Sequence, residues 1–142
     1  MQRKGSAVWT GGLKDGKGTV STQSGVLNNT QYSFATRFEN GIGTNPEELL
    51  GAAHAGCFSM ALANSLARGG FTVNSIKTEA KVHIEKQDAG FTITKIELET
   101  IGDITGADEK TFVEHAEKSK AGCPVSKALL GPMITLTAKL KS

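Results

Sequence analysis

Two cysteines, Cys57 and Cys123, are the residues of this chain that most directly suggest chemistry. They are 66 positions apart, with no Cys-X-X-Cys spacing and no second pair of metal-ligand type, so neither a zinc site nor a thioredoxin-like motif is supported. In a reducing compartment both should rest as thiols. A disulfide between them would therefore be transient, and either catalytic or regulatory.

The two cysteines differ in how their surroundings would favour the thiolate, which is the reactive form. Cys57 lies in an apolar segment, where a small buried hydrophobic residue is the simpler interpretation. Cys123 precedes Pro124 and should cap a short helix, whose N–H groups and dipole would lower the thiol pKa. Local features alone therefore favour Cys123 as the nucleophile.

His54 is a third candidate, because it precedes Cys57 by three positions and shares its helix face. This spacing permits a Cys–His pair that activates a thiolate for acyl chemistry. A buried histidine with a structural hydrogen bond is the simpler interpretation. Spacing alone leaves both open.

A long helix should position Cys57 and His54. Asn45 can cap it, Pro46 takes its first position, and Glu48 lies three residues after the cap, as in a capping box. The helix should end near Arg68, before two glycines. Its apolar residues cover almost every side, so we expect it to be central or shared with a second subunit. Polar residues interrupt the apolar stretch, which favours a helix buried in protein over one spanning lipid.

The remaining elements predict an α+β fold with largely antiparallel sheets packed around this central helix. In one expected strand the aromatic residues alternate, so Arg37 should point away from them. In another expected strand, the apolar residues change from odd to even positions, which predicts a bulge near Thr94 and Lys95. Strands are expected at residues 7–10, 18–21, 31–38, 75–85, 91–101 and 133–140, and further helices at 107–121 and 124–130.

Composition predicts one soluble domain over residues 1–142. The chain is 38% hydrophobic and 21% charged, with a net charge of only +2. It has no long basic run and only eight aromatic residues, so a nucleic-acid binder is not expected. No apolar signal region follows the basic residues near the N-terminus, and we therefore expect a cytoplasmic protein.

Several segments together resemble the osmotically inducible protein C (OsmC) family of the OsmC/Ohr superfamily, in which Ohr denotes organic hydroperoxide resistance proteins. The most specific combination is Asn-Pro-Glu-Glu-Leu before a helical cysteine, followed much later by Cys-Pro. The matching segments lie at residues 18–21, 25–28, 37–39, 43–49, 52–61, 88–91 and 121–126. Residues 25–58 resemble the OsmC branch more than the Ohr branch.

The resemblance implies a thiol-dependent peroxidase that reduces organic hydroperoxides in oxidative or osmotic stress defence. It implies that Cys57 is the peroxidatic cysteine, Cys123 the resolving cysteine, and Glu47 a carboxylate that orients Arg37. The resemblance therefore makes Cys57 the nucleophile, whereas the helix-cap argument favoured Cys123. We follow the resemblance, because a nearby guanidinium could shift the pKa of Cys57 more than a helix cap shifts the pKa of Cys123. The resemblance implies an intrasubunit disulfide that a dithiol then reduces, and the family suggests a donor of lipoyl type. No metal, haem or flavin is implied.

The resemblance also implies an intertwined homodimer, and helix geometry supports a shared site. Glu47 and Cys57 are ten residues apart on one expected helix, so their Cα atoms should be separated by about 15 Å along its axis. A glutamate cannot span that distance. We therefore expect Glu47 to act on the Cys57 site of the partner subunit.

Two other classes of function remain open at this point. A Cys–His acyl-transfer enzyme would use His54 as its base. A non-enzymatic stress protein would bind a small hydrophobic ligand in the apolar centre, independently of both cysteines.

Overall fold

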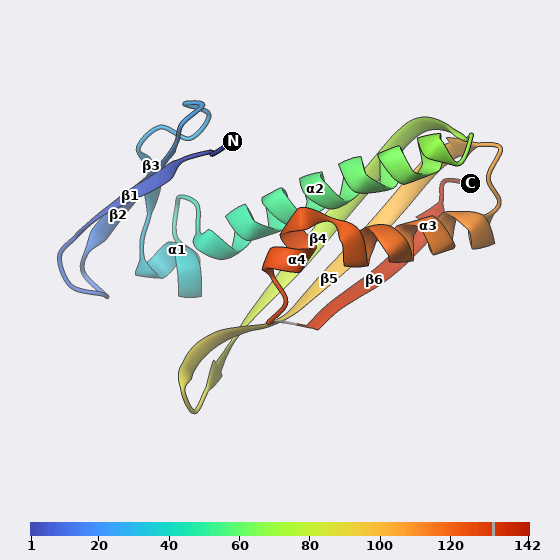
Figure 1. Ribbon diagram of the computed structural model, residues 1–142. Coiled ribbons are helices and arrows are strands. Elements are labelled where there is room, and N and C mark those ends of the chain that lie inside the picture. Colours follow the sequence, from blue (N-terminus) through green and yellow to red (C-terminus); the bar gives the residue numbers. More distant parts are fainter. Residues whose placement is uncertain (132) are drawn as a thin grey trace. The chain divides into compact units, whose positions relative to one another are not determined.

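The computed structural model describes residues 1–131 and 133–142, which form two compact units, Met1–Leu49 and Leu50–Ser142. Each unit has a three-stranded sheet of its own (Figure 1). The mixture of strands and helices confirms the expected α+β class.

The first unit is built on an antiparallel sheet of consecutive strands. Its strands are β1 (Gly5–Thr10), β2 (Lys17–Thr22) and β3 (Thr30–Tyr32), in the order β1-β2-β3. Gly18 of β2 lies directly under two aromatic rings: a Cβ at this position would come 2.3 Å from an atom of Tyr32 and 2.7 Å from one of Trp9. Only a glycine leaves room for both rings on this part of the sheet.

The strand expected over residues 31–38 is wrong beyond Tyr32. The chain instead forms a short helix, α1 (Phe34–Phe38), which begins at the N-cap Ser33. A capping box closes it, in which the Thr36 N–H donates to Ser33 Oγ at 3.3 Å and the Ser33 N–H donates to Thr36 Oγ1 at 2.8 Å. Residues four apart meet on a helix, and the rings of Phe34 and Phe38 are 5.0 Å apart.

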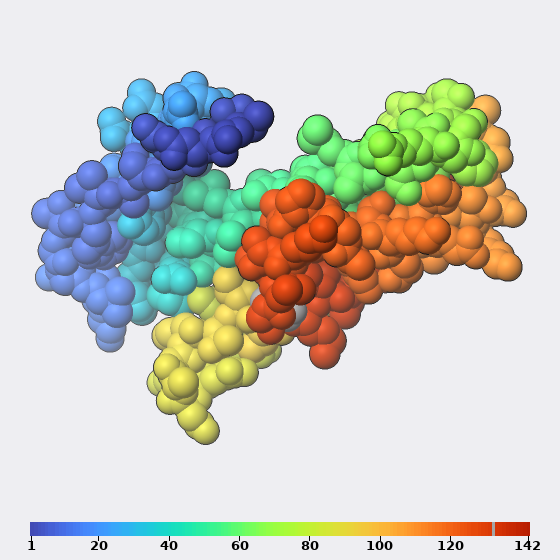
Figure 2. Space-filling model, in the orientation of Figure 1, coloured from blue at the N-terminus to red at the C-terminus, as the bar shows by residue number. Residues whose placement is uncertain are grey.

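The second unit contains a mixed sheet in the order β4-β5-β6. Strands β4 (Thr72–Gln87) and β5 (Gly90–Thr105) form a long antiparallel hairpin, and β6 (Met133–Leu140) pairs parallel to β5. The predicted bulge is confirmed, because His83 pairs with Lys95 while Ile84 pairs with Ile93, which leaves Thr94 as the extra residue. The tip of the hairpin, yellow in Figures 1 and 2, projects from the rest of this unit.

The long helix α2 (Pro46–Arg68) has the predicted bounds. Asn45 caps it, since its Oδ1 accepts the Glu48 N–H at 2.8 Å. The helix ends where Gly70 adopts a φ of +87°, a conformation that favours glycine. By length and composition alone α2 could cross a membrane. However, three of its apolar side chains are completely buried in the core of the protein: Phe58, Leu62 and Leu66.

Two further helices follow the sheet hairpin and complete the core. They are α3 (Glu109–Gly122), capped by Asp108, and α4 (Pro124–Ala128), capped by Cys123 as predicted. Helices α2 and α3 cover one face of the β4-β5-β6 sheet (Figure 1). The fully buried side chains of the core are Phe58, Leu62, Leu66, Ile96, Leu98, Phe112, Ala116 and Cys123.

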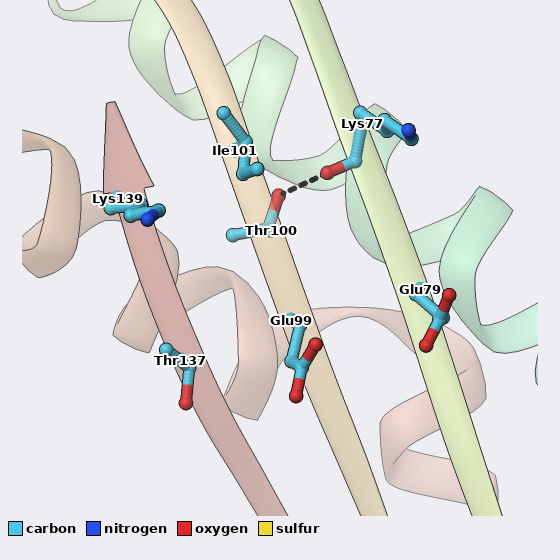
Figure 3. A pocket seen from close by; sticks show the side chains of 7 residues that line it. All are labelled: Lys77, Glu79, Glu99, Thr100, Ile101, Thr137 and Lys139. Atoms are coloured by element: carbon cyan, nitrogen blue, oxygen red, sulfur yellow. Dashed lines mark hydrogen bonds between the residues drawn. The ribbon is translucent and has the colours of Figure 1, made fainter. Parts of the chain in front are cut away.

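The opposite face of this sheet is polar. Around a shallow hollow, the lysines form one row across the strands and the glutamates form the next row (Figure 3). Thr100 lies among these positions but is buried, and its hydroxyl donates to the Lys77 carbonyl at 3.3 Å. The hollow is lined by Lys77, Glu79, Glu99, Thr100, Ile101, Thr137 and Lys139. It carries both signs of charge and no cysteine or histidine, and we assign it no chemistry.

The packing of α3 on the sheet depends on Gly102, a buried residue of β5. A Cβ at this position would come 2.5 Å from Cε2 of the fully buried Phe112 ring. Gly102→Ala should therefore force the ring aside and lower the free energy of unfolding by about 1–3 kcal/mol. Urea unfolding at a fixed protein concentration measures this change.

Gly122→Ala is the matched control, because no atom lies within 4 Å of the position of its added Cβ. Its free energy of unfolding should be unchanged or higher, by up to about 1 kcal/mol. Equal effects of the two substitutions would contradict the role given to Gly102.

Candidate active site

The second unit brings the two cysteines together. Cys57 lies in the middle of α2, and Cys123 caps α4; both belong to the same hydrophobic core. Their side chains are within hydrogen-bonding reach of each other. Cys123 is completely buried, whereas Cys57 is partly exposed. Only Cys57 can therefore meet a substrate from solvent without a movement of the core.

Burial raises the pKa of the Cys57 thiol, because it disfavours the charged thiolate. The backbone N–H of Val125 opposes this by donating a hydrogen bond to the sulfur, while the neighbouring Cys123 raises the pKa further. Among the described residues of the second unit, no positive charge contributes to this balance. A cation close to Cys57 would oppose the effect of burial on the pKa and favour the thiolate.

A hydrogen-bonded chain of buried side chains begins at Cys123. Its thiol donates to the Ser126 hydroxyl at 3.1 Å, and the Ser126 backbone N–H donates to the same sulfur at 3.3 Å. The Ser126 hydroxyl also bonds His54 Nε2, at 2.7 Å. His54 is thus joined to Cys123 through Ser126.

This arrangement decides between the two interpretations of His54. Its Nε2 is occupied by Ser126, and its Nδ1 has no hydrogen-bond partner among the described residues, so it forms no Cys–His pair with Cys57. Burial lowers the pKa of His54 and favours the neutral ring. Ser126 is not among the residues singled out from the sequence. This residue lies three positions after Cys123, and at that position the backbone N–H binds the side chain that caps the helix.

The first unit brings Arg37 and Glu47 together. Arg37 Nε donates to Glu47 Oε1 at 2.9 Å, and an Nη2 of the same guanidinium lies 2.8 Å from that oxygen. The Glu47 side chain is 8% exposed and that of Arg37 is 39% exposed. The buried carboxylate therefore fixes the orientation of a guanidinium that still reaches solvent.

A small aromatic pocket lies beside Arg37 in the same unit. The guanidinium carbon is 5.2 Å from the centre of the Phe38 ring, and the rings of Trp9 and Tyr32 are 5.4 Å apart. The pocket has a volume of about 270 Å³ and is lined by Trp9, Leu13, Tyr32, Ser33, Phe34, Arg37 and Phe38. The lining of this pocket is mostly apolar and includes one positive charge, the guanidinium of Arg37. The expectation that Arg37 points away from the aromatic side chains is wrong, because α1 replaces the expected strand.

In the described part of the chain, no three histidine, cysteine or acidic side chains are grouped so that they could hold a metal ion. The chemistry available here is that of two thiols, a buried Ser–His pair and an oriented guanidinium.

Comparison with known proteins points to peroxiredoxin and organic hydroperoxide resistance proteins. The chain is 56% identical over 142 residues to the peroxiredoxin OsmC of Escherichia coli K12, covering 100% of this chain and 99% of the relative. It is 28% identical over 115 residues to the organic hydroperoxide resistance protein OhrB of Bacillus subtilis, covering 80% and 82% of the two chains. A solved organic hydroperoxide resistance protein from Elizabethkingia anophelis superposes with a TM-score of 0.77 at 27% identity, covering 99% of each chain.

The model of the family described as OsmC-like protein matches residues 39–139, a range that includes Glu47 and both cysteines. A match of this extent, together with full-length identity to a member, identifies the family. This chain therefore belongs to the OsmC family.

Proposed function

We propose that this protein, a cysteine-based peroxidase of the OsmC family, reduces hydroperoxides through Cys57 as the peroxidatic residue and Cys123 as the resolving residue. The thiolate of Cys57 attacks the distal oxygen of the peroxide, so that an S–O bond forms and the O–O bond breaks. The alkoxide or hydroxide that departs takes up one proton, equal to the one lost when the thiol ionised, and leaves as alcohol or water. The resulting sulfenic acid condenses with the Cys123 thiol to give an intrasubunit disulfide and water. The observation that carries this assignment is the contact between a partly exposed thiol and a completely buried one.

The oriented guanidinium of Arg37 supplies the positive charge that the Cys57 thiolate lacks. A free thiol with a pKa of about 8.5 is only a few per cent ionised at neutral pH, and a fixed cation nearby lowers that pKa. Arginine keeps its own proton throughout and can also polarise the breaking O–O bond. Glu47 acts as a positioning residue, because its buried carboxylate holds Arg37 by two contacts.

Arg37 and Glu47 complete the Cys57 site of the partner subunit in an obligate homodimer, in which residues 1–142 act as a single OsmC-like domain. Helix α2 is continuous from Pro46 to Arg68, so Glu47 and Cys57 are separated by about 15 Å along its axis. One side of α2 is exposed and carries small or apolar residues, which suit close packing against a second copy: Ala52, Ala53, Gly56 and Met60.

The aromatic pocket beside Arg37 binds the organic part of the peroxide. Its volume suits a group of a few carbon atoms, and apolar walls with few polar groups are typical of small-molecule sites. The guanidinium at its edge would face the peroxide oxygens. This pocket favours organic hydroperoxides over hydrogen peroxide, which has no apolar part to bury.

A dithiol of lipoyl type returns the disulfide to the reduced state. A reducing cytoplasm would keep such a donor available. The acyl-transfer alternative loses its base, because His54 bonds Ser126 and not Cys57. We place the enzyme in the cytoplasm and in oxidative or osmotic stress defence.

Cys57→Ser should abolish turnover of cumene hydroperoxide in a stopped-flow assay with a dithiol. Cys123→Ser should still reduce one equivalent of peroxide per subunit, but excess peroxide should carry Cys57 on to sulfinic acid, because no thiol intercepts the sulfenic acid. In the wild-type protein, non-reducing mass spectrometry should find the Cys57–Cys123 link within one subunit. Turnover that survives Cys57→Ser, or a link found only between subunits, would refute the mechanism.

The shared site can be tested by mixing two inactive variants. Arg37→Ala subunits keep Cys57, and Cys57→Ser subunits keep Arg37, so a heterodimer contains one complete site only if the residues meet across the interface. After co-refolding, random pairing should restore about a quarter of the wild-type activity. Glu47→Ala mixed with Cys57→Ser should behave in the same way. A mixture that stays inactive, while the wild type refolds fully, contradicts the shared site.

The pocket assignment predicts a change in substrate preference. Phe34→Ala should lower kcat/KM for cumene hydroperoxide by about tenfold, as expected for the loss of one large apolar contact, and leave kcat/KM for hydrogen peroxide nearly unchanged. The matched control is Phe71→Ala, because Phe71 lies in the second unit and packs against His115. Equal losses with both peroxides would instead indicate damage to Arg37.

A further inference from the structure

The reaction described above leaves one buried titratable side chain unused. His54 is completely buried, yet it makes one hydrogen bond, to Ser126, and its Nδ1 has no partner among the described residues. An apolar side chain of similar size would fill this place in the core without leaving a ring nitrogen unpaired. The position therefore calls for an explanation beyond packing.

The Cys123 thiol has a related difficulty. Resolution requires the Cys123 proton to leave as the new S–S bond forms, but Cys123 is 0% exposed and cannot pass that proton directly to bulk water. Its thiol donates to Ser126 Oγ at 3.1 Å, and Ser126 is itself only 2% exposed. The hydroxyl of Ser126 is the acceptor that this thiol contacts.

The three groups are arranged in the order that a proton transfer needs. With its one hydrogen directed to His54, the Ser126 hydroxyl can accept from Cys123 and donate to Nε2 at 2.7 Å. The ring then carries its own proton on Nδ1. We propose that Ser126 and His54 form a proton relay that deprotonates the resolving cysteine, Cys123.

The step balances as follows, and it rests on the proposed peroxidase function. The Cys123 sulfur attacks the Cys57 sulfenic sulfur, the S–S bond forms and the S–O bond breaks. The Cys123 proton passes to Ser126 Oγ while the Ser126 proton passes to His54 Nε2. The hydroxide that departs from the Cys57 sulfur takes up one proton from the solvent that reaches Cys57 and leaves as water. His54 afterwards gives up the one proton that it received, so the sum is one thiol and one sulfenic acid converted to one disulfide and one water.

Ser126 contacts a reacting atom and is a catalytic residue in this step, whereas His54 acts through it and is a positioning residue that also holds the proton. The lowered pKa of His54 is consistent with this role, because the ring is neutral and free to accept when the sulfenic acid forms. The relay acts on resolution alone, so the first chemical step, at Cys57, should not depend on it.

Single-turnover kinetics separate the two steps. Reduced protein is mixed with one equivalent of cumene hydroperoxide and quenched at intervals; dimedone traps the Cys57 sulfenic acid, and mass spectrometry quantifies the disulfide. His54→Gln keeps a group that can bond Ser126 but cannot take up a proton. It should form sulfenic acid at the wild-type rate and form the disulfide about 100-fold more slowly, the lower range of what a positioned base contributes.

Ser126→Ala should slow disulfide formation to a similar degree, and Ser126→Thr, which retains the hydroxyl, should restore most of the rate. The double variant His54→Gln with Ser126→Ala should be no slower than either single variant, because both break one relay. If the two substitutions instead damaged the structure independently, the double variant would form the disulfide more slowly than either single variant. If His54→Gln does not fold, the Ser126→Ala and Ser126→Thr pair decides the question.

The chain offers a matched control in a second Ser–His pair, in which Ser65 Oγ lies 2.7 Å from His115 Nδ1. His115→Gln should leave both steps unchanged. Disulfide formation at the wild-type rate in His54→Gln or Ser126→Ala would overturn the relay while leaving the peroxidase function intact. Absence of sulfenic acid at Cys57 in Cys123→Ser, where no thiol can intercept it, would overturn both.

Discussion

The Cys57 thiol must ionise to react, yet burial against the core raises its pKa. Its contact with Cys123, which makes a disulfide possible, raises that pKa further, so the arrangement that favours resolution opposes the first step. The Val125 N–H at the start of α4 compensates only in part. In the proposed mechanism the remaining compensation is the positive charge of Arg37, whose orientation the buried carboxylate of Glu47 fixes.

Much of the fold could be predicted because its signals are local or periodic. The bounds of α2 follow from an N-cap asparagine, a proline at the first position and two glycines at the end, and each acts within one turn. The bulge at Thr94 follows from a change of the apolar residues from odd to even positions. A strand that packs one face on a core needs one extra residue to keep its apolar side chains on that face. Such features need no knowledge of distant residues.

The failures have physical causes of another kind. Apolar residues at every second position are typical of a strand. Two aromatic residues four positions apart, such as Phe34 and Phe38, are equally typical of a helix, and the Ser33–Thr36 capping box favours the helix. The bond between His54 and Ser126 joins residues 72 positions apart. The spacing of His54 to Cys57 indicated a different partner, because sequence separation shows which residues share a helix face but not which element packs against that face.

The unequal burial of the two thiols also fits the order of steps in the proposed reaction. Because Cys123 is completely buried and Cys57 is partly exposed, the proposed mechanism begins with oxidation of Cys57. The same burial removes Cys123 from the water that would otherwise take its proton, and a slow resolution would leave the sulfenic acid open to a second peroxide. An internal proton acceptor removes this conflict, since it lets the resolving thiol remain buried and still react promptly. The unpaired Nδ1 of His54 is then the structural cost of placing a base inside an apolar core.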